Sequence, residues 1–86
     1  MAPDKLAILR HESSLVVPAL SKCLSDANNA VRIFAAQGLG WYGAEARQAV
    51  PALVPLLSDP CVLARDTAAY ALKQIDPEAA AKAGVK

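Results

Sequence analysis

The sequence predicts an all-α protein, a short α-solenoid in which antiparallel helix pairs stack side by side. Two observations predict it: one segment recurs after 33 residues, and the apolar residues within each copy follow helical spacing. A repeat of this length accommodates one pair of helices, which buries its apolar face only by packing on a neighbouring pair. The 86 residues are therefore expected to form one domain that is a stack of repeats and not a closed globule.

The repeat aligns without a gap. Val17–Leu20 recurs as Val50–Leu53, and 11 of the 23 residues from 17 to 39 are identical to the residue 33 positions later. Chance does not readily produce such agreement, so we interpret the two segments as copies of one structural unit.

The period divides the single domain, residues 1–86, into four parts. Repeat one is expected over 12–43 and repeat two over 44–75. A flanking N-terminal helix is expected over 3–11, and a partial third repeat, or C-terminal cap, over 76–86.

The first helix of each repeat is predicted to present one apolar face. In repeat two, the spacing i, i+4, i+7, i+8, i+11 defines this face, which consists of Ala46, Val50, Leu53, Val54 and Leu57. The same positions of repeat one are less apolar: Ser13, Val17, Leu20, Ser21 and Leu24.

Prolines lie inside these first helices, at Pro18 in repeat one and at Pro51 and Pro55 in repeat two. Each proline removes a backbone hydrogen bond, so each is expected to kink its helix. With two prolines, repeat two is expected to bend more than repeat one.

Acidic and proline residues predict where the later helices begin. At Asp59–Pro60 the carboxylate is expected to cap free backbone N–H groups while the proline fits the first helical turn, and Asp76–Pro77 repeats this signal. In repeat one, the residue that caps the second helix is expected to be Asp26, Asn28 or Asn29.

Glycines predict the end of the second helix of repeat one. Gly40 and Gly43 are expected to supply close-approach or left-handed backbone. The core stripe of the two second helices is then predicted to be Val31, Ala35 and Leu39, with Ala64, Ala68 and Leu72 as the equivalents.

The combined pattern Val-Pro-Ala-Leu, Leu-Ser-Asp, Val-Arg-x-x-Ala-Ala and Leu-Gly-x-x-Gly resembles a HEAT repeat, and more closely the bacterial HEAT-like repeats of the phycobilisome-lyase type. The matching residues of repeat one are Pro18, Leu20, Leu24, Asp26, Val31, Arg32, Ala35, Ala36, Leu39 and Gly40. Those of repeat two are Pro51, Leu53, Leu57, Asp59, Arg65, Ala68, Ala69 and Leu72.

The resemblance implies a right-handed superhelix of antiparallel helix pairs. It also implies a ladder in which Asp26 and Asp59 meet Arg32 and Arg65, because an arginine fork can bridge carboxylates of adjacent repeats. These residues recur at the period of the repeat, so we interpret them as structural and not catalytic.

In the HEAT family, the second helices line the concave binding face. Exposed isoleucine, tryptophan and tyrosine there would form an apolar patch that binds a protein partner. Alternatively, Trp41 packs over the following repeat. The outward positions are Ile33, Gln37 and Trp41 in repeat one and Asp66, Tyr70 and Gln74 in repeat two.

Other chemically interesting residues are few. His11 is the single histidine and is expected to be exposed or to cap a helix. A metal site needs several ligands, and one histidine does not provide them. Cys23 is expected to pack as a small hydrophobe, and Cys61 stands near a helix N-terminus, which lowers the pKa of a thiol. The sequence does not decide whether a disulfide joins the two cysteines. We expect no enzyme, no metal and no cofactor.

The net charge and the length of the apolar runs limit which functions and locations are expected. The net charge is +1 and the basic residues are scattered, which disfavours nucleic-acid binding. The apolar runs are too short for a membrane span, and a cytoplasmic location is expected. The sequence favours a protein-interaction or scaffold module. Alternatives are a self-assembling piece or subunit of a larger array, with a possible homo-oligomer through its end faces, and, from the resemblance alone, an accessory lyase or chaperone-like factor.

Overall fold

The computed structural model describes the backbone of residues 5–85 and the side chains of residues 12–85. Five α-helices follow one another, and two 3-10 helices flank the third. They are α1 (Lys5–Cys23), α2 (Asn29–Tyr42), η1 (Gly43–Ala49), α3 (Val50–Leu53), η2 (Val54–Ser58), α4 (Val62–Ile75) and α5 (Pro77–Lys82). The described residues contain helices and turns and no strand, so the predicted all-α class is confirmed.

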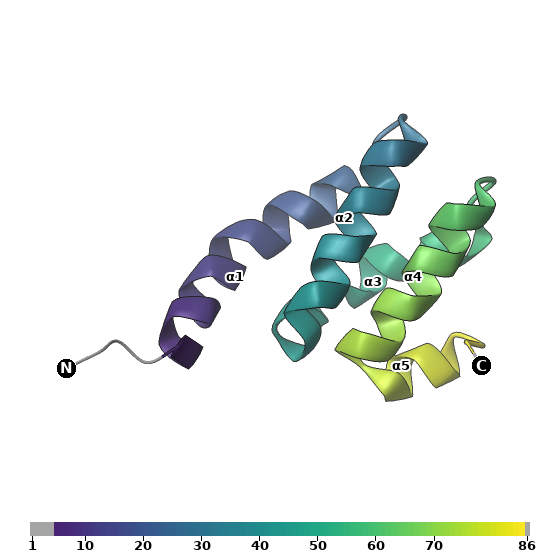
Figure 1. The fold of residues 1–86 in the computed structure, drawn as a ribbon. Helices are drawn as coiled ribbons and strands as arrows, with labels where there is room; N and C mark the ends of the chain where they lie inside the picture. The colour runs from purple at the N-terminus through teal and green to yellow at the C-terminus, as the bar shows by residue number, and fades with distance from the viewer. Residues whose placement is uncertain (1–4, 86) are drawn as a thin grey trace.

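The helices form two layers (Figure 1). Helices α2 and α4 lie side by side and run in the same direction, and α3 lies behind them. Helix α2 runs antiparallel to α1, and α4 runs antiparallel to the segment from η1 to η2. Helix α5 crosses the C-terminal end of α4. The arrangement is two stacked antiparallel helix pairs, as the 33-residue period predicts.

Helix α1 differs from the prediction at its beginning. The sequence predicts a separate flanking helix over 3–11, but α1 runs without a break from Lys5 to Cys23. No glycine or proline occurs between Lys5 and Val17, so nothing there interrupts helical backbone. Pro18 is tolerated inside the helix, and α1 curves visibly in Figure 1.

The first helix of repeat two is interrupted, as its two prolines predict. It is divided into η1, α3 and η2, and Pro51 and Pro55 stand in the first turns of α3 and η2. Ala46 leaves helical geometry altogether, with φ −96° and ψ 15°. Proline supplies no N–H to the helical ladder, which favours short 3-10 segments over a continuous α-helix.

The core runs between the two layers and through both repeats. Its largest fully buried side chains are Val17, Leu39, Leu53, Leu72 and Ile75. All but Ile75 were expected on a core-facing stripe. The stripe of α4 is buried as predicted, and it consists of Ala64, Ala68 and Leu72.

One predicted core position is wrong. Val54 was expected on the apolar face of repeat two, but it is exposed, while Ala49 and Leu56 are buried instead. A 3-10 turn takes three residues and an α-helical turn 3.6, so the face that meets α4 shifts along the sequence.

Two glycines end and position α2. Gly43 has φ +60°, and its N–H donates to the carbonyl of Gly40, which closes the helix as predicted. Gly40 faces α4 closely: a Cβ added there would lie 3.1 Å from the Cα of Ala71 and 3.2 Å from its Cβ. Glycine at position 40 therefore sets how near α2 and α4 can approach.

Candidate functional site

One cross-repeat ion pair joins the turns that precede α2 and α4. The guanidinium of Arg32 donates twice to the carboxylate of Asp59, from Nε to Oδ2 at 2.8 Å and from Nη2 to Oδ1 at 3.1 Å. Both side chains are largely buried, with 15% of Arg32 and 8% of Asp59 exposed. This two-pronged contact is the geometry in which arginine binds carboxylates most strongly.

A second contact of the arginines repeats at the 33-residue period. Arg32 Nη1 donates to the carbonyl of Asp26 at 2.7 Å, and Arg65 Nη1 donates to the carbonyl of Asp59 at 2.7 Å. Among the residues with described side chains, neither Asp26 nor Arg65 forms a cross-repeat ion pair. The ladder implied by the family resemblance therefore contains one ion pair between repeats, Arg32–Asp59. The other contacts of the two arginines stabilise the turns of their own repeats.

The aspartates shape the turns but do not cap the helices in the predicted way. Asp59 Oδ1 accepts from the N–H of Cys61 at 2.9 Å, which places Asp59 and Pro60 before the helix. Asp26 accepts likewise from Asn28, and the side chain of Asn28 caps α2. The predicted aspartate cap occurs at α5, where Asp76 accepts from the N–H of Ala79. For α2, the cap Asn28 is one of the three residues that the sequence offers. A two-residue Asx turn competes with capping for the same carboxylate.

The hydrogen bonds from Arg32 hold the pKa of Asp59 below its usual value, and the N–H of Cys61 lowers it further. The charged carboxylate is thus the form that the folded chain favours.

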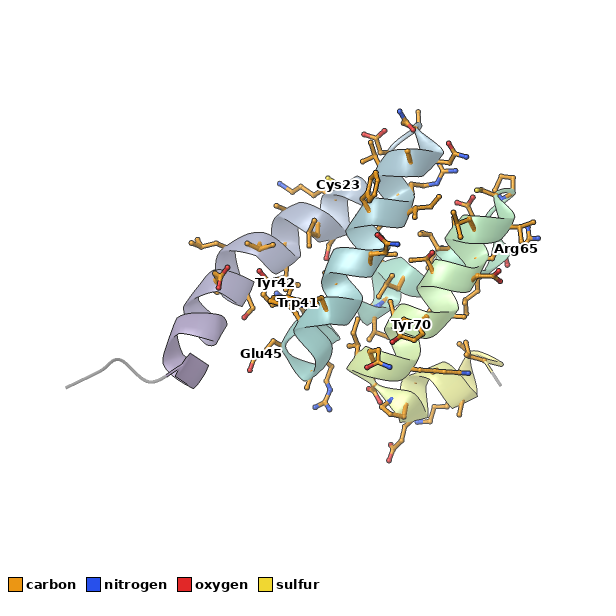
Figure 2. The ribbon with its side chains drawn as sticks, in the orientation of Figure 1. Cys23, Trp41, Tyr42, Glu45, Arg65 and Tyr70 are labelled. Atoms are coloured by element: carbon orange, nitrogen blue, oxygen red, sulfur yellow. The ribbon has the colours of Figure 1, made fainter. Side chains whose placement is uncertain are left out.

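A groove lies between α2 and α4 on the face away from α1 and α3. Its floor consists of the small residues Ala36, Gly40 and Ala71, and Gly40 faces Ala71 closely across the two helices. Trp41 lines it from α2 and Tyr70 from α4, and 77% and 66% of their surfaces are exposed. Figure 2 labels both residues, Trp41 near the C-terminal end of α2 and Tyr70 on α4. The hollow has a volume of about 500 Å³. We call it the α2–α4 groove.

Polar side chains complete the lining of this groove. Gln37 comes from α2, and Asp66, Thr67 and Gln74 come from α4. The hydroxyl of Thr67 donates to the carbonyl of Leu63 at 2.7 Å, which leaves its oxygen lone pairs free to accept. The groove combines aromatic walls with hydrogen-bonding groups, a composition found in many binding sites.

The structure brings five of the six residues predicted for the binding face together in the α2–α4 groove: Gln37, Trp41, Asp66, Tyr70 and Gln74. Ile33 does not line it and is half-buried, contrary to the exposed position that the sequence predicts. Phe34 and Trp41 are seven residues apart, so both lie on the solvent-facing side of α2. Ile33 precedes Phe34 by one residue, so it is rotated by about 100° around the helix axis, away from that side.

Trp41 does not pack over the following repeat. It is exposed, and its ring meets that of Tyr42 edge to face, with centroids 5.5 Å apart. Tyr42 is partly buried against the core. Tyr42 therefore anchors the end of α2, and Trp41 faces solvent.

Phe34 is an exposed aromatic residue that is not among those predicted for the binding face. It is 69% exposed and lies seven residues, or two helical turns, before Trp41. Leu63 is likewise exposed and precedes Tyr70 by seven. That shared spacing is the sequence signal that identifies both, and they extend the apolar surface beyond the groove.

The two cysteines are free thiols, so no disulfide joins them. Cys61 lies just before α4. Hydrogen bonding to the backbone N–H of Ala64 lowers the pKa of its thiol, and the side chain of Asn29, with Nδ2 3.4 Å from Sγ, lowers it further. The lowered pKa expected from the sequence is thus present, although Asp59 opposes it.

The described residues show neither a metal centre nor a membrane span. No group of three or more potential metal ligands occurs among the described side chains. No helix in the described part of the chain combines the length and apolar character needed to cross a bilayer. His11 lies outside the described side chains.

Comparison with known proteins identifies the family. Residues 17–83 match the family model described as HEAT repeats, and since this is most of the chain, the protein belongs to the HEAT repeat family. The comparison with curated proteins and the comparison with solved structures give no match.

Proposed function

We propose that this HEAT repeat chain is a non-catalytic interaction module that binds a segment of a partner protein along the α2–α4 groove. HEAT repeat modules generally act as protein-interaction scaffolds. The observation that carries the proposal is the pair of exposed aromatic side chains, Trp41 and Tyr70, on either side of a floor of alanine and glycine.

The exposure of these rings has a physical cost. Large apolar side chains are ordinarily removed from water, and a cluster of them on a monomer marks an interaction site. Tryptophan and tyrosine are also the residues most enriched among those that dominate binding energy. Phe34 and Leu63 are also exposed, two helical turns before Trp41 and Tyr70, so they add apolar surface on the same sides of α2 and α4.

The remaining groups suit binding better than catalysis. Gln37, Thr67 and Gln74 are neutral and can pair with the backbone of a bound segment.

The free thiols Cys23 and Cys61 support a reducing, cytoplasmic compartment.

Affinity capture from the source lysate, followed by mass spectrometry, tests the proposal. The bait proteins are the wild-type chain and a Trp41→Ala, Tyr70→Ala double variant. A matched control is Leu15→Ala, since Leu15 is an equally exposed apolar residue on α1, in the other layer. We expect the double variant to lose a partner that the wild type and the control both retain.

Retention of every partner by the double variant would contradict the assignment of the groove. Loss of the same partners by Leu15→Ala would point to a general effect of surface hydrophobicity instead. Circular dichroism of each variant establishes that the helices remain folded.

A second candidate function, self-association through an end face, is favoured by Arg65. It occupies the position of Arg32 one repeat later, but among the described residues it meets no carboxylate of another repeat. The exposed turn at Asp26 of a second copy would supply that carboxylate. Light scattering over a range of concentrations tests it: a dimer weakened by Arg65→Ala supports self-association, and a monomer at every concentration excludes it.

A further inference from the structure

We infer that the partner segment is basic and that it places an arginine side chain over Tyr70, beside Asp66, in the α2–α4 groove. This inference rests on the proposed function, because it specifies the chemistry of the segment that the same groove binds.

The charge of the groove is the first argument. Of the described residues that line it, Asp66 is the one with a charged side chain. The chain as a whole has a net charge of +1, so this negative charge is a local feature of the groove. Arg65 and Lys73 do not line the groove. They line a second hollow, toward α5, which Asp66 also borders, and Arg65 is engaged with the carbonyl of Asp59.

The hydrogen-bonding character of the groove is the second argument. An ionised carboxylate such as Asp66 only accepts hydrogen bonds. The hydroxyl hydrogen of the adjacent Thr67 is already used on the carbonyl of Leu63, so this oxygen also presents lone pairs. This end of the groove therefore requires donors, and a guanidinium supplies five N–H groups.

The position of the aromatic ring is the third argument. Asp66 and Tyr70 are four residues apart on α4, so their side chains are neighbours on its surface, about 6 Å apart along the axis. A cation held by the carboxylate is therefore within reach of the tyrosine ring. Arginine stacks on aromatic faces better than lysine because its cation is planar and weakly hydrated.

The same three features disfavour an acidic occupant. A carboxylate or phosphate placed against Asp66 would meet a like charge, and the groove offers no cationic side chain to balance it. Trp41, on the α2 side, is then available to cover the aliphatic part of the arginine or an adjacent apolar side chain.

Selection from a phage-displayed library of random linear peptides, with the full chain as bait, tests the inference. Four proteins are compared: wild type, Asp66→Asn, the Trp41→Ala, Tyr70→Ala double variant, and Glu78→Gln. The last removes one exposed carboxylate on α5, outside the groove, and so matches the charge change of Asp66→Asn.

We expect the wild type and Glu78→Gln to select peptides enriched in arginine, and Asp66→Asn to lose that enrichment. In the best peptide, replacement of the arginine by citrulline, a neutral analogue of similar shape, should weaken binding by about threefold to tenfold. The same replacement should have little further effect on Asp66→Asn, because the carboxylate and the guanidinium act as a pair.

Two other outcomes separate this inference from the proposed function. If the selected peptides depend on Trp41 and Tyr70 but show no enrichment of basic residues, or bind Asp66→Asn equally well, the inference is overturned while the groove assignment stands. If no selected peptide depends on Trp41 and Tyr70, both are overturned.

Discussion

Arg32 and Asp59 join the two repeats through one largely buried ion pair. The carboxylate accepts two bonds from the guanidinium and one from the N–H of Cys61, so its negative charge is well satisfied away from water. A charge in this setting depends on its partner, because removal of one member leaves the other buried without compensation.

The lowered pKa of Asp59 predicts how stability depends on pH. Because the folded-state pKa lies below the unfolded value, this carboxylate contributes stability above the unfolded pKa and loses it as the pH falls through the folded pKa. Urea unfolding of wild type and Asp59→Asn should therefore differ most near neutral pH, and the difference should shrink below about pH 4. A difference that is independent of pH would contradict the role of the ionised carboxylate.

The lowered pKa of Cys61 predicts a thiol that reacts at lower pH than an ordinary cysteine. Alkylation by iodoacetamide, followed by mass spectrometry of the Cys61 peptide over a range of pH, measures it. Asn29→Ala should raise the midpoint, because the Asn29 amide stabilises the thiolate. An unchanged midpoint in that variant would show that the amide makes no such contact in solution.

At the scale of elements, the second helices were the most predictable part of the chain. The stripes of α2 and α4 follow a regular helical period, and Gly40 and Gly43 mark the end of α2. The first helices were less predictable, because proline shifts the geometry between α and 3-10 by amounts that tertiary packing decides. This is why the sequence placed Val54 in the core where the structure buries Leu56.

The groove could be predicted in part for a similar reason. A shared period of 33 residues places Gln37 beside Tyr70 and Trp41 beside Gln74 once the helices are known to stack. The spare lone pairs of Thr67 depend on a side-chain rotamer that no sequence pattern reports.

The approach of α2 to α4 predicts different effects for two glycines of α2. Gly40→Ala would place a Cβ 3.1 Å from the backbone Cα of Ala71, so α2 and α4 must move apart by a few tenths of an ångström. We expect this strain, about 1–3 kcal/mol, to offset or exceed the gain in helix propensity of about 1 kcal/mol. Gly38→Ala meets only the end of the Leu20 side chain, at 2.9 Å, which can rotate away. Alanine also favours helix over glycine by about 1 kcal/mol, so Gly38→Ala should be neutral or stabilising.

Chemical denaturation of both variants measures these effects. Destabilisation by Gly38→Ala that equals that of Gly40→Ala would show that helix separation is not the cause. The Gly40→Ala variant should also weaken binding of a partner in the α2–α4 groove, since position 40 lines the groove beside Ala71.

At the scale of the whole molecule, a single core connects both repeats. Val17 of α1, Leu39 of α2 and Leu72 of α4 are fully buried in one cluster, so neither helix pair is packed independently of the other. This is the behaviour expected of a solenoid, in which each repeat is stabilised by its neighbour.

The shared core predicts a steep contrast between neighbouring positions. Leu53→Ala removes a fully buried side chain and should lower the free energy of unfolding by about 2–5 kcal/mol, a large part of the stability of a small domain. Val54→Ala, at the next and exposed position, should change it by about 0.5 kcal/mol or less. Equal effects in a denaturation experiment would mean that the interrupted first helix of repeat two does not face α4 as described.

The most direct test of the central claim is to map the bound partner by NMR on the complex of the chain with a selected or captured peptide. We expect nuclear Overhauser contacts from the peptide to the rings of Trp41 and Tyr70, with chemical shift changes along α2 and α4. Contacts confined to α1 or α5, with the Trp41 and Tyr70 resonances unchanged, would contradict it.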